Sequence, residues 1–140
     1  MPDGTLPSLL LAPLPHGYSI SKLPPGSPAP DWAFGDGCVS VTVVEDETSI
    51  VCRSDRVPNG VETSSGWTAV KVTTRFDLDE PGVVLAAVKP ISQAGLGIFV
   101  LSTYYRDYIL VRTAEMERAI RLWTDAGHEV GDQAVDDQAR

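Results

Sequence analysis

The chain has 140 residues, of which 43% are hydrophobic and 21% charged, the composition of a folded domain rather than a disordered one. Its 19 acidic residues outnumber 11 basic ones, which gives a formal net charge of −8. Nucleic acids and anionic membranes bind basic patches, so this balance argues against both as partners. No apolar run approaches the roughly 20 residues that cross a bilayer, and we expect a cytoplasmic protein.

The first half of the chain predicts short strands and little helix. Residues 24–30 contain four prolines and must form a loop, while Asp31–Phe34 has room for a single helical turn. Turn-forming residues at Asn59–Gly60 and Ser64–Gly66 mark the expected seam with the second half. The candidate strands are Leu6–Leu11, Tyr18–Leu23, Cys38–Val44 and Ser49–Arg53.

The only cysteines are Cys38 and Cys52, and their spacing matches no zinc or redox signature. If a hairpin turns between them, Val39 and Val41 share one face with Cys52, and Cys38 points to the other face. A bridge is then difficult to form. We predict two reduced, structural cysteines.

The second half predicts strands alternating with helices. The expected elements are strands Trp67–Thr73, Gly97–Ser102, Tyr108–Val111 and His128–Val130 and helices Val83–Ala94 and Ala114–Ala126. On the first helix Val84, Val88 and Ile91 fall on one stripe that should face the core, and Pro90 should kink or shorten the helix. The order βαββαβ is that of a ferredoxin-like unit, so we predict an α+β fold.

Two of the predicted strands, Gly97–Ser102 and Tyr108–Val111, are apolar at nearly every position. A ferredoxin-like sheet carries helices on one face only, and its other face normally alternates between apolar and polar residues. Apolar residues on both faces imply that the open face is covered. The first half of the chain, another subunit or both could provide the cover.

Two segments of the second half resemble a known family. Asp79–Val84 has the sequence Asp-Glu-Pro-Gly-Val-Val, and Ser102–Asp107 has the sequence Ser-Thr-Tyr-Tyr-Arg-Asp between two apolar strands. Both are similar to segments of small bacterial ACT-domain proteins related to the CASTOR-type arginine sensors. The resemblance spans about residues 67–126 and extends more weakly to Tyr18–Leu23 and Val39–Thr42.

This resemblance implies a tandem arrangement of ACT-like units, often within a homodimer. The division would be a degenerate N-terminal ACT-like unit over residues 1–62, an ACT domain over 63–130 and a flexible tail over 131–140. In the family, small ligands, typically amino acids, bind where the loop after the first strand faces a neighbouring strand. Carried over to this sequence, one wall would be lined by Glu80, Gly82, Val83 and Val84, and the other by Thr103, Tyr104 and Asp107.

The chemistry of these residues suits an amino acid. Gly82 precedes a helix whose free backbone N–H groups can hold a carboxylate. Asp107 or Glu80 can pair with an ammonium group, and Thr103 can supply a hydroxyl and a backbone carbonyl.

Simpler interpretations of the same residues stay open. Asp107 could be only a residue of a hairpin turn, and Gly82 could only open the helix. Asp77, Asp79 and Glu80 could form a solvated acidic loop, and the tyrosines could serve packing alone.

Nothing in the sequence indicates catalysis. The only histidines are His16, between a proline and a glycine, and His128, after a helix stop; both are expected at exposed or edge positions. Neither forms a metal pair with a cysteine at a recognisable spacing, and the nucleotide-binding glycine motifs are absent. We therefore expect a regulatory protein that is not an enzyme and uses no metal or cofactor. The alternative is an oligomerisation or interaction module without a ligand.

Overall fold

The computed structural model describes residues 5–131 and divides into two compact units. The strand unit comprises residues 16–67, and the helical unit comprises residues 5–15 together with 68–131. The N-terminal segment thus groups with the second half of the chain, whereas the sequence placed it with the first. The predicted tail, from residue 132 onward, lies outside the described residues.

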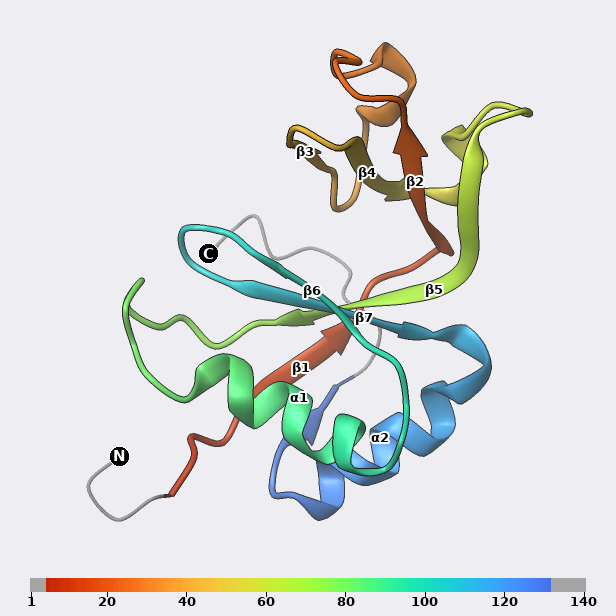
Figure 1. Cartoon of the computed structure of the whole chain (residues 1–140). Coiled ribbons are helices and arrows are strands. Elements are labelled where there is room, and N and C mark those ends of the chain that lie inside the picture. Colours follow the sequence, from red (N-terminus) through yellow and green to blue (C-terminus); the bar gives the residue numbers. More distant parts are fainter. Residues whose placement is uncertain (1–4, 132–140) are drawn as a thin grey trace. The chain divides into compact units, whose positions relative to one another are not determined.

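The elements of the helical unit follow the predicted order closely (Figure 1). The α+β class and the βαββαβ order are confirmed. Its strands are β1 (Leu10–Pro13), the last residues of β5 (Glu62–Val72), β6 (Phe99–Ser102), β7 (Asp107–Arg112) and β8 (Glu129–Val130). Its helices are α1 (Val83–Gln93), the short 3-10 turn η3 (Thr113–Glu115) and α2 (Met116–Asp125).

The sheet of the helical unit has the order β6-β7-β5-β1-β8. Strand β1 lies between the first and last strands of the βαββαβ unit, antiparallel to β5 and parallel to β8. Both helices cover one face of this sheet (Figure 1). Leu9 and Leu11 are buried in the core that the helices cover, and Leu10 between them is exposed. The N-terminal segment is therefore an integral strand of the helical unit.

Pro90 does not shorten α1, because two side chains bond to the carbonyls around it. A proline has no N–H to donate to the carbonyl of Ala86, four residues earlier. Instead His128 Nε2 lies 3.1 Å from that oxygen, and Trp123 Nε1 donates to the Ala87 oxygen at 2.8 Å. His128 Nδ1 accepts from the Leu9 N–H at 2.9 Å, so Nε2 carries the proton. His128 directly precedes the edge strand β8, but it is not exposed, since its exposed fraction is 7%.

The strand unit is an antiparallel sheet with the order β3-β4-β2-β5, formed by β2 (Tyr18–Leu23), β3 (Ser40–Val43), β4 (Thr48–Arg53) and the first residues of β5. Residues 16–67 hold no α-helix, only the 3-10 turns η1 (Asp31–Ala33) and η2 (Ser54–Arg56). The predicted turn at Ser64–Gly66 is wrong, because β5 runs through it. Gly66 has a φ of 86° there, and the register with β2 shifts as in a β-bulge.

The two cysteines are free, as predicted. Cys52 is buried beside Ala33 and Ile50, with Val39 and Val41 packed against the same cluster. Burial raises the pKa of the Cys38 thiol to about 11, so its reactive thiolate is disfavoured at neutral pH. Both residues are packing groups of the strand unit.

Candidate functional site

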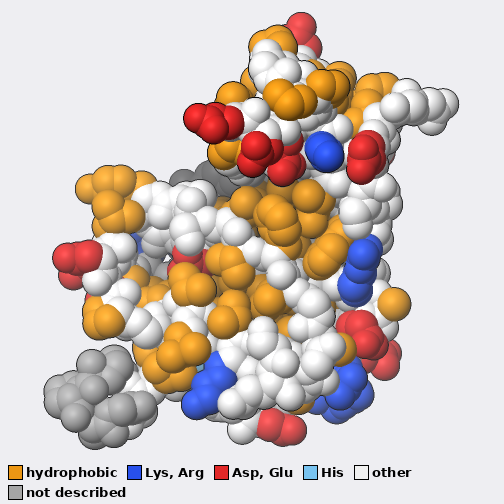
Figure 2. Space-filling model, viewed as in Figure 1, with side chains coloured by type: hydrophobic (Ala, Val, Ile, Leu, Met, Phe, Trp, Pro, Cys, Tyr) orange, Lys and Arg blue, Asp and Glu red, His pale blue; other side chains and the backbone are white. Residues whose placement is uncertain are grey.

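A pocket of about 220 Å³ opens in the helical unit. Its walls are the loop between β5 and α1, the first turn of α1 and the β6–β7 turn. Figure 2 shows hydrophobic and acidic side chains together at the left of the view, over that loop and that turn. All the residues that the sequence placed in a ligand site line this one pocket: Glu80, Gly82, Val83, Val84, Thr103, Tyr104 and Asp107.

One wall of the pocket is the start of α1. Gly82 is the residue before the helix and has a φ of 87°, a left-handed conformation that favours glycine. Within the described part of the chain no side chain caps this end, and the first helical hydrogen bond runs from Ala86 N to Gly82 O at 2.9 Å. The N–H groups of the first turn therefore have no intrahelical acceptor and can receive an anion.

The predicted core stripe of α1 is wrong at one position. The buried residues of the helix are Val83, Ala86, Ala87 and Ile91, whereas Val84 is 40% exposed. The helix is turned so that the stripe through Val83 and Ala87, not the one through Val84, contacts the sheet. Val84 is thereby left at the pocket wall.

The opposite wall is the β6–β7 turn, which its own hydrogen bonds hold in place. Thr103 N donates to Arg106 O at 2.7 Å, and the Thr103 hydroxyl bonds to the same oxygen and to Arg106 N. Asp107 is not at the hairpin tip, because it pairs with Ser102 in the sheet and accepts from the Ser102 hydroxyl at 2.5 Å. The Thr103 hydroxyl is thus engaged in the turn, and the Asp107 carboxylate is held at the pocket.

Arg106 is a pocket residue that sequence reasoning missed. Its Nε donates to the Thr73 carbonyl at 3.4 Å, a weak bond that links the turn to the end of β5. It adds a positive charge to a pocket whose other charged groups are acidic. The only signal for it in the sequence is its position directly before Asp107. The remaining residues that were missed come from β5, the loop after it, α1 and the β6–β7 hairpin: Val72, Thr74, Phe76, Asp77, Leu78, Leu85, Ser102 and Tyr105.

The rim of the pocket is apolar and exposed. Tyr104 and Leu78 are 68% and 69% exposed, and Leu85 and Tyr105 are exposed beside them. The two tyrosine rings meet edge to face, with their centroids 4.9 Å apart, and the Arg75 guanidinium lies 4.0 Å from the Tyr105 centroid. These tyrosines pack on each other at the surface and not in the core.

The pocket brings together partners for both ends of an amino acid. The uncapped helix start and Arg106 can hold a carboxylate, and the carboxylates of Asp107 and Glu80 can hold an ammonium group. Within residues 5–131 no group of three or more His, Cys, Asp or Glu side chains is placed to hold a metal ion. No helix in this part of the chain is both long and apolar enough to cross a membrane.

Comparisons with known proteins identify an ACT domain, in agreement with the resemblance seen in the sequence. A family model for the ACT domain matches residues 62–124, and a second model, described as an N-terminal domain, matches residues 16–60. None of the curated protein sequences matches the chain.

Solved structures extend the match to most of the chain. Protein Atu0741 from Agrobacterium tumefaciens is 39% identical, with a TM-score of 0.87 over 94% of this chain and 98% of its own. VC0802 from Vibrio cholerae, of unknown function, is 16% identical, with a TM-score of 0.68 over 85% and 90%. The regulatory subunit of aspartate kinase from Thermus thermophilus shares the fold at 13% identity, with a TM-score of 0.57 over 84% and 97%. The chain therefore carries an ACT domain and belongs to the same family as Atu0741.

Proposed function

We propose that this protein is a non-catalytic regulatory protein that binds a small molecule, an amino acid, in the pocket at the start of α1. One observation carries the proposal: the seven residues selected from the sequence line a single pocket. The resemblance to CASTOR-type arginine sensors and the shared fold with an aspartate kinase regulatory subunit also support a regulatory role. A cytoplasmic location fits this role.

The geometry suggests how the ligand would lie. Its carboxylate would face the uncapped N–H groups of α1 and the Arg106 guanidinium, and its ammonium group would face Asp107 and Glu80. Its side chain would then contact the apolar rim at Leu78 and Tyr104. A volume of about 220 Å³ suits one molecule of this size and not a nucleotide cofactor.

The exposed rim supports a homodimer as the functional form. Five large apolar side chains that line the pocket are exposed: Leu78, Val84, Leu85, Tyr104 and Tyr105. A contiguous exposed apolar patch is typical of an interaction site. A second copy that covered this rim would place the ligand between two ACT units, and binding would then favour one relative orientation of the copies.

A thermal-unfolding screen against the twenty amino acids tests ligand binding. A ligand at 100 times its dissociation constant stabilises by about 2.7 kcal/mol, which raises the midpoint by several degrees. Asp107→Asn should abolish the shift, because it removes the charge that faces the ammonium group. Asp125→Asn, at an exposed aspartate of α2 that does not line the pocket, is the matched control: it removes the same charge elsewhere and should retain binding. Equal binding by both variants would remove Asp107 from the site.

The same exposed rim favours a second candidate, an oligomerisation module without a ligand. Sedimentation of the wild type and of Tyr104→Ser, with and without the amino acids, separates the two candidates. If Tyr104→Ser dissociates a dimer and no amino acid shifts the unfolding midpoint, the protein is an oligomerisation module and not a sensor. A thermal shift that depends on Asp107 would exclude the module.

A further inference from the structure

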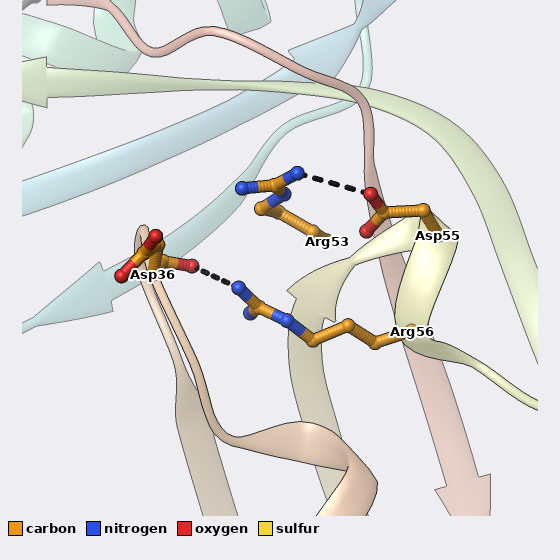
Figure 3. Close-up of polar contacts among 4 residues, drawn as sticks. All are labelled: Asp36, Arg53, Asp55 and Arg56. Carbon is orange, nitrogen blue, oxygen red and sulfur yellow. Dashed lines mark hydrogen bonds and ion pairs between the residues drawn. The ribbon is translucent and has the colours of Figure 1, made fainter.

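The strand unit carries a pair of arginines that the pocket does not use. Arg53 ends β4 and Arg56 ends the 3-10 turn that follows. Residues 16–67 contain seven acidic and three basic residues, so this pair supplies two of the three positive side chains of an acidic unit. Figure 3 shows both guanidinium groups pointing into the same region, next to Asp36.

The two guanidinium groups have too few acceptors. Arg53 Nη2 donates to Asp55 Oδ2 at 3.0 Å, and Arg56 Nη2 donates to the backbone carbonyl of Asp36 at 2.7 Å. Arg53 Nε and Arg56 Nη1 are buried and have no hydrogen-bond partner among residues 5–131. A buried donor on a charged group costs free energy when it is left without an acceptor. Two donors on neighbouring arginines therefore need an acceptor from outside these residues.

The charges are also out of balance. Among residues 5–131, Asp55 is the only carboxylate bonded to either arginine, since Asp36 offers its backbone oxygen. The hydrogen bond from Arg53 holds the pKa of Asp55 below its usual range. Asp55 is thus ionised at neutral pH but balances only one of the two guanidinium charges. A second negative charge would balance the other.

The surrounding loop contacts both arginines. A Cβ on Gly35 would lie 2.5 Å from the guanidinium carbon of Arg56, and a Cβ on Gly37 would lie 3.5 Å from Arg53 Cδ. The backbone at Gly35 therefore approaches Arg56 as closely as only glycine allows, and the backbone at Gly37 is in ordinary contact with Arg53. Tyr18 ties the same loop down by accepting the Cys38 N–H at 2.9 Å. Donors that are held in this way lose little freedom when a ligand binds.

We propose that Arg53 and Arg56 form a second binding site, for a small oxyanion whose oxygens accept from Arg53 Nε and Arg56 Nη1. Guanidinium groups present planar N–H donors that match carboxylate and phosphate oxygens. The ligand is a carboxylate or a phosphate group. It satisfies both buried donors and supplies the missing negative charge.

Side-chain NMR of the full chain tests the site directly. The Nε–H signals of the arginines are followed while sodium phosphate or sodium succinate is added at constant ionic strength, against sodium chloride alone. The Arg53 signal should move and saturate as an anion is added. The anion that saturates it at the lower concentration shows whether the site prefers a phosphate or a carboxylate group. Arg121, exposed on α2, is the internal control. No saturable movement at Arg53, or equal movement at Arg121, would overturn the proposal.

Substitutions give an independent readout. Arg53→Gln should weaken the apparent affinity for the anion by about tenfold or more, since a hydrogen bond to a charged group is lost. Arg121→Gln should leave the affinity unchanged. Arg56→Gln also removes the bond to the Asp36 carbonyl and could unfold the loop, so Arg53→Lys, which keeps the charge, is the second variant. Wild-type affinity in both Arg53 variants would overturn the site.

Discussion

The two units of this protein bury different kinds of side chain. The helical unit packs a continuous apolar core in which Trp123, Ile91 and Ile109 are completely buried. The strand unit buries a small cluster of Ala33, Ile50 and Cys52.

Polar contacts hold the strand unit as well. Ser19 Oγ lies 2.7 Å from Ser54 Oγ and 3.0 Å from Ser65 Oγ, and Ser21 Oγ lies 3.0 Å from Thr63 Oγ1. Without an α-helix to cover its sheet, this unit relies on hydroxyl contacts and on close backbone approaches at glycine. The helical unit should therefore be sensitive to lost volume, and the strand unit to added volume.

Removing volume from the helical core should have the largest effect. Trp123→Ala should lower the free energy of unfolding by about 3–5 kcal/mol, because it leaves a cavity and removes the bond to the Ala87 carbonyl. Trp32→Ala, at a partly buried tryptophan of the strand unit, is the matched comparison and should cost less. Urea unfolding measures both. Equal losses of unfolding free energy would show that the two cores contribute equally to stability.

Adding volume at a glycine should have the next largest effect, in the strand unit. Gly37 and Gly60 have nearly the same φ, 90° and 91°. A Cβ on Gly60 meets nothing within 4 Å, so Gly60→Ala carries only the backbone strain, roughly 1–2 kcal/mol. Gly37→Ala also drives its Cβ into the Tyr18 hydroxyl and should cost about 1–3 kcal/mol more, as overpacking does.

Removing the Tyr18 hydroxyl tests whether the clash with it causes the extra cost of Gly37→Ala. Gly37→Ala should cost less in a Tyr18→Phe background than in the wild type, since the obstructing oxygen is gone. Thermal or urea unfolding of the wild type, Gly37→Ala, Tyr18→Phe and the double variant gives the coupling free energy between the two positions. Equal costs for Gly37→Ala and Gly60→Ala would mean that the loop moves away freely and that close approach does not stabilise the strand unit.

The smallest of these effects should come from the hydrogen bonds around Pro90. His128→Ala leaves the Leu9 N–H and the Ala86 carbonyl without their partner and should cost about 1–3 kcal/mol. Pro90→Ala restores the N–H that bonds to the Ala86 carbonyl inside the helix, so the double variant should recover part of the loss. A double-mutant cycle on urea unfolding measures this coupling. Strict additivity would mean that His128 does not compensate for the proline.

Local patterns were sufficient to predict most elements, and the family resemblance added seven residues that line the pocket. The periodicity of residues 67–130 gave the βαββαβ order, because each element has its own apolar pattern within a dozen residues. Gly82 and Asp107 were selected because the resemblance to ACT-domain proteins carries the ligand-site residues over to these positions, and the helix start after Gly82 is visible in the chain. The finer prediction of which helix face is buried failed at Val84, since packing against the sheet sets the rotation of the helix.

Features that depend on residues far apart in the chain were decided by the tertiary structure. Insertion of β1 between β5 and β8 pairs Leu11 with Val72 and Val130, and no local pattern specifies such partners. Burial of His128 follows from the same insertion, because its partners Leu9 and Ala86 come from distant segments. By itself the sequence determined where strands and helices form, since periodicity and turn residues act locally. The structure decided which of them pair and which side chains meet, because those contacts depend on chain segments that only folding brings together.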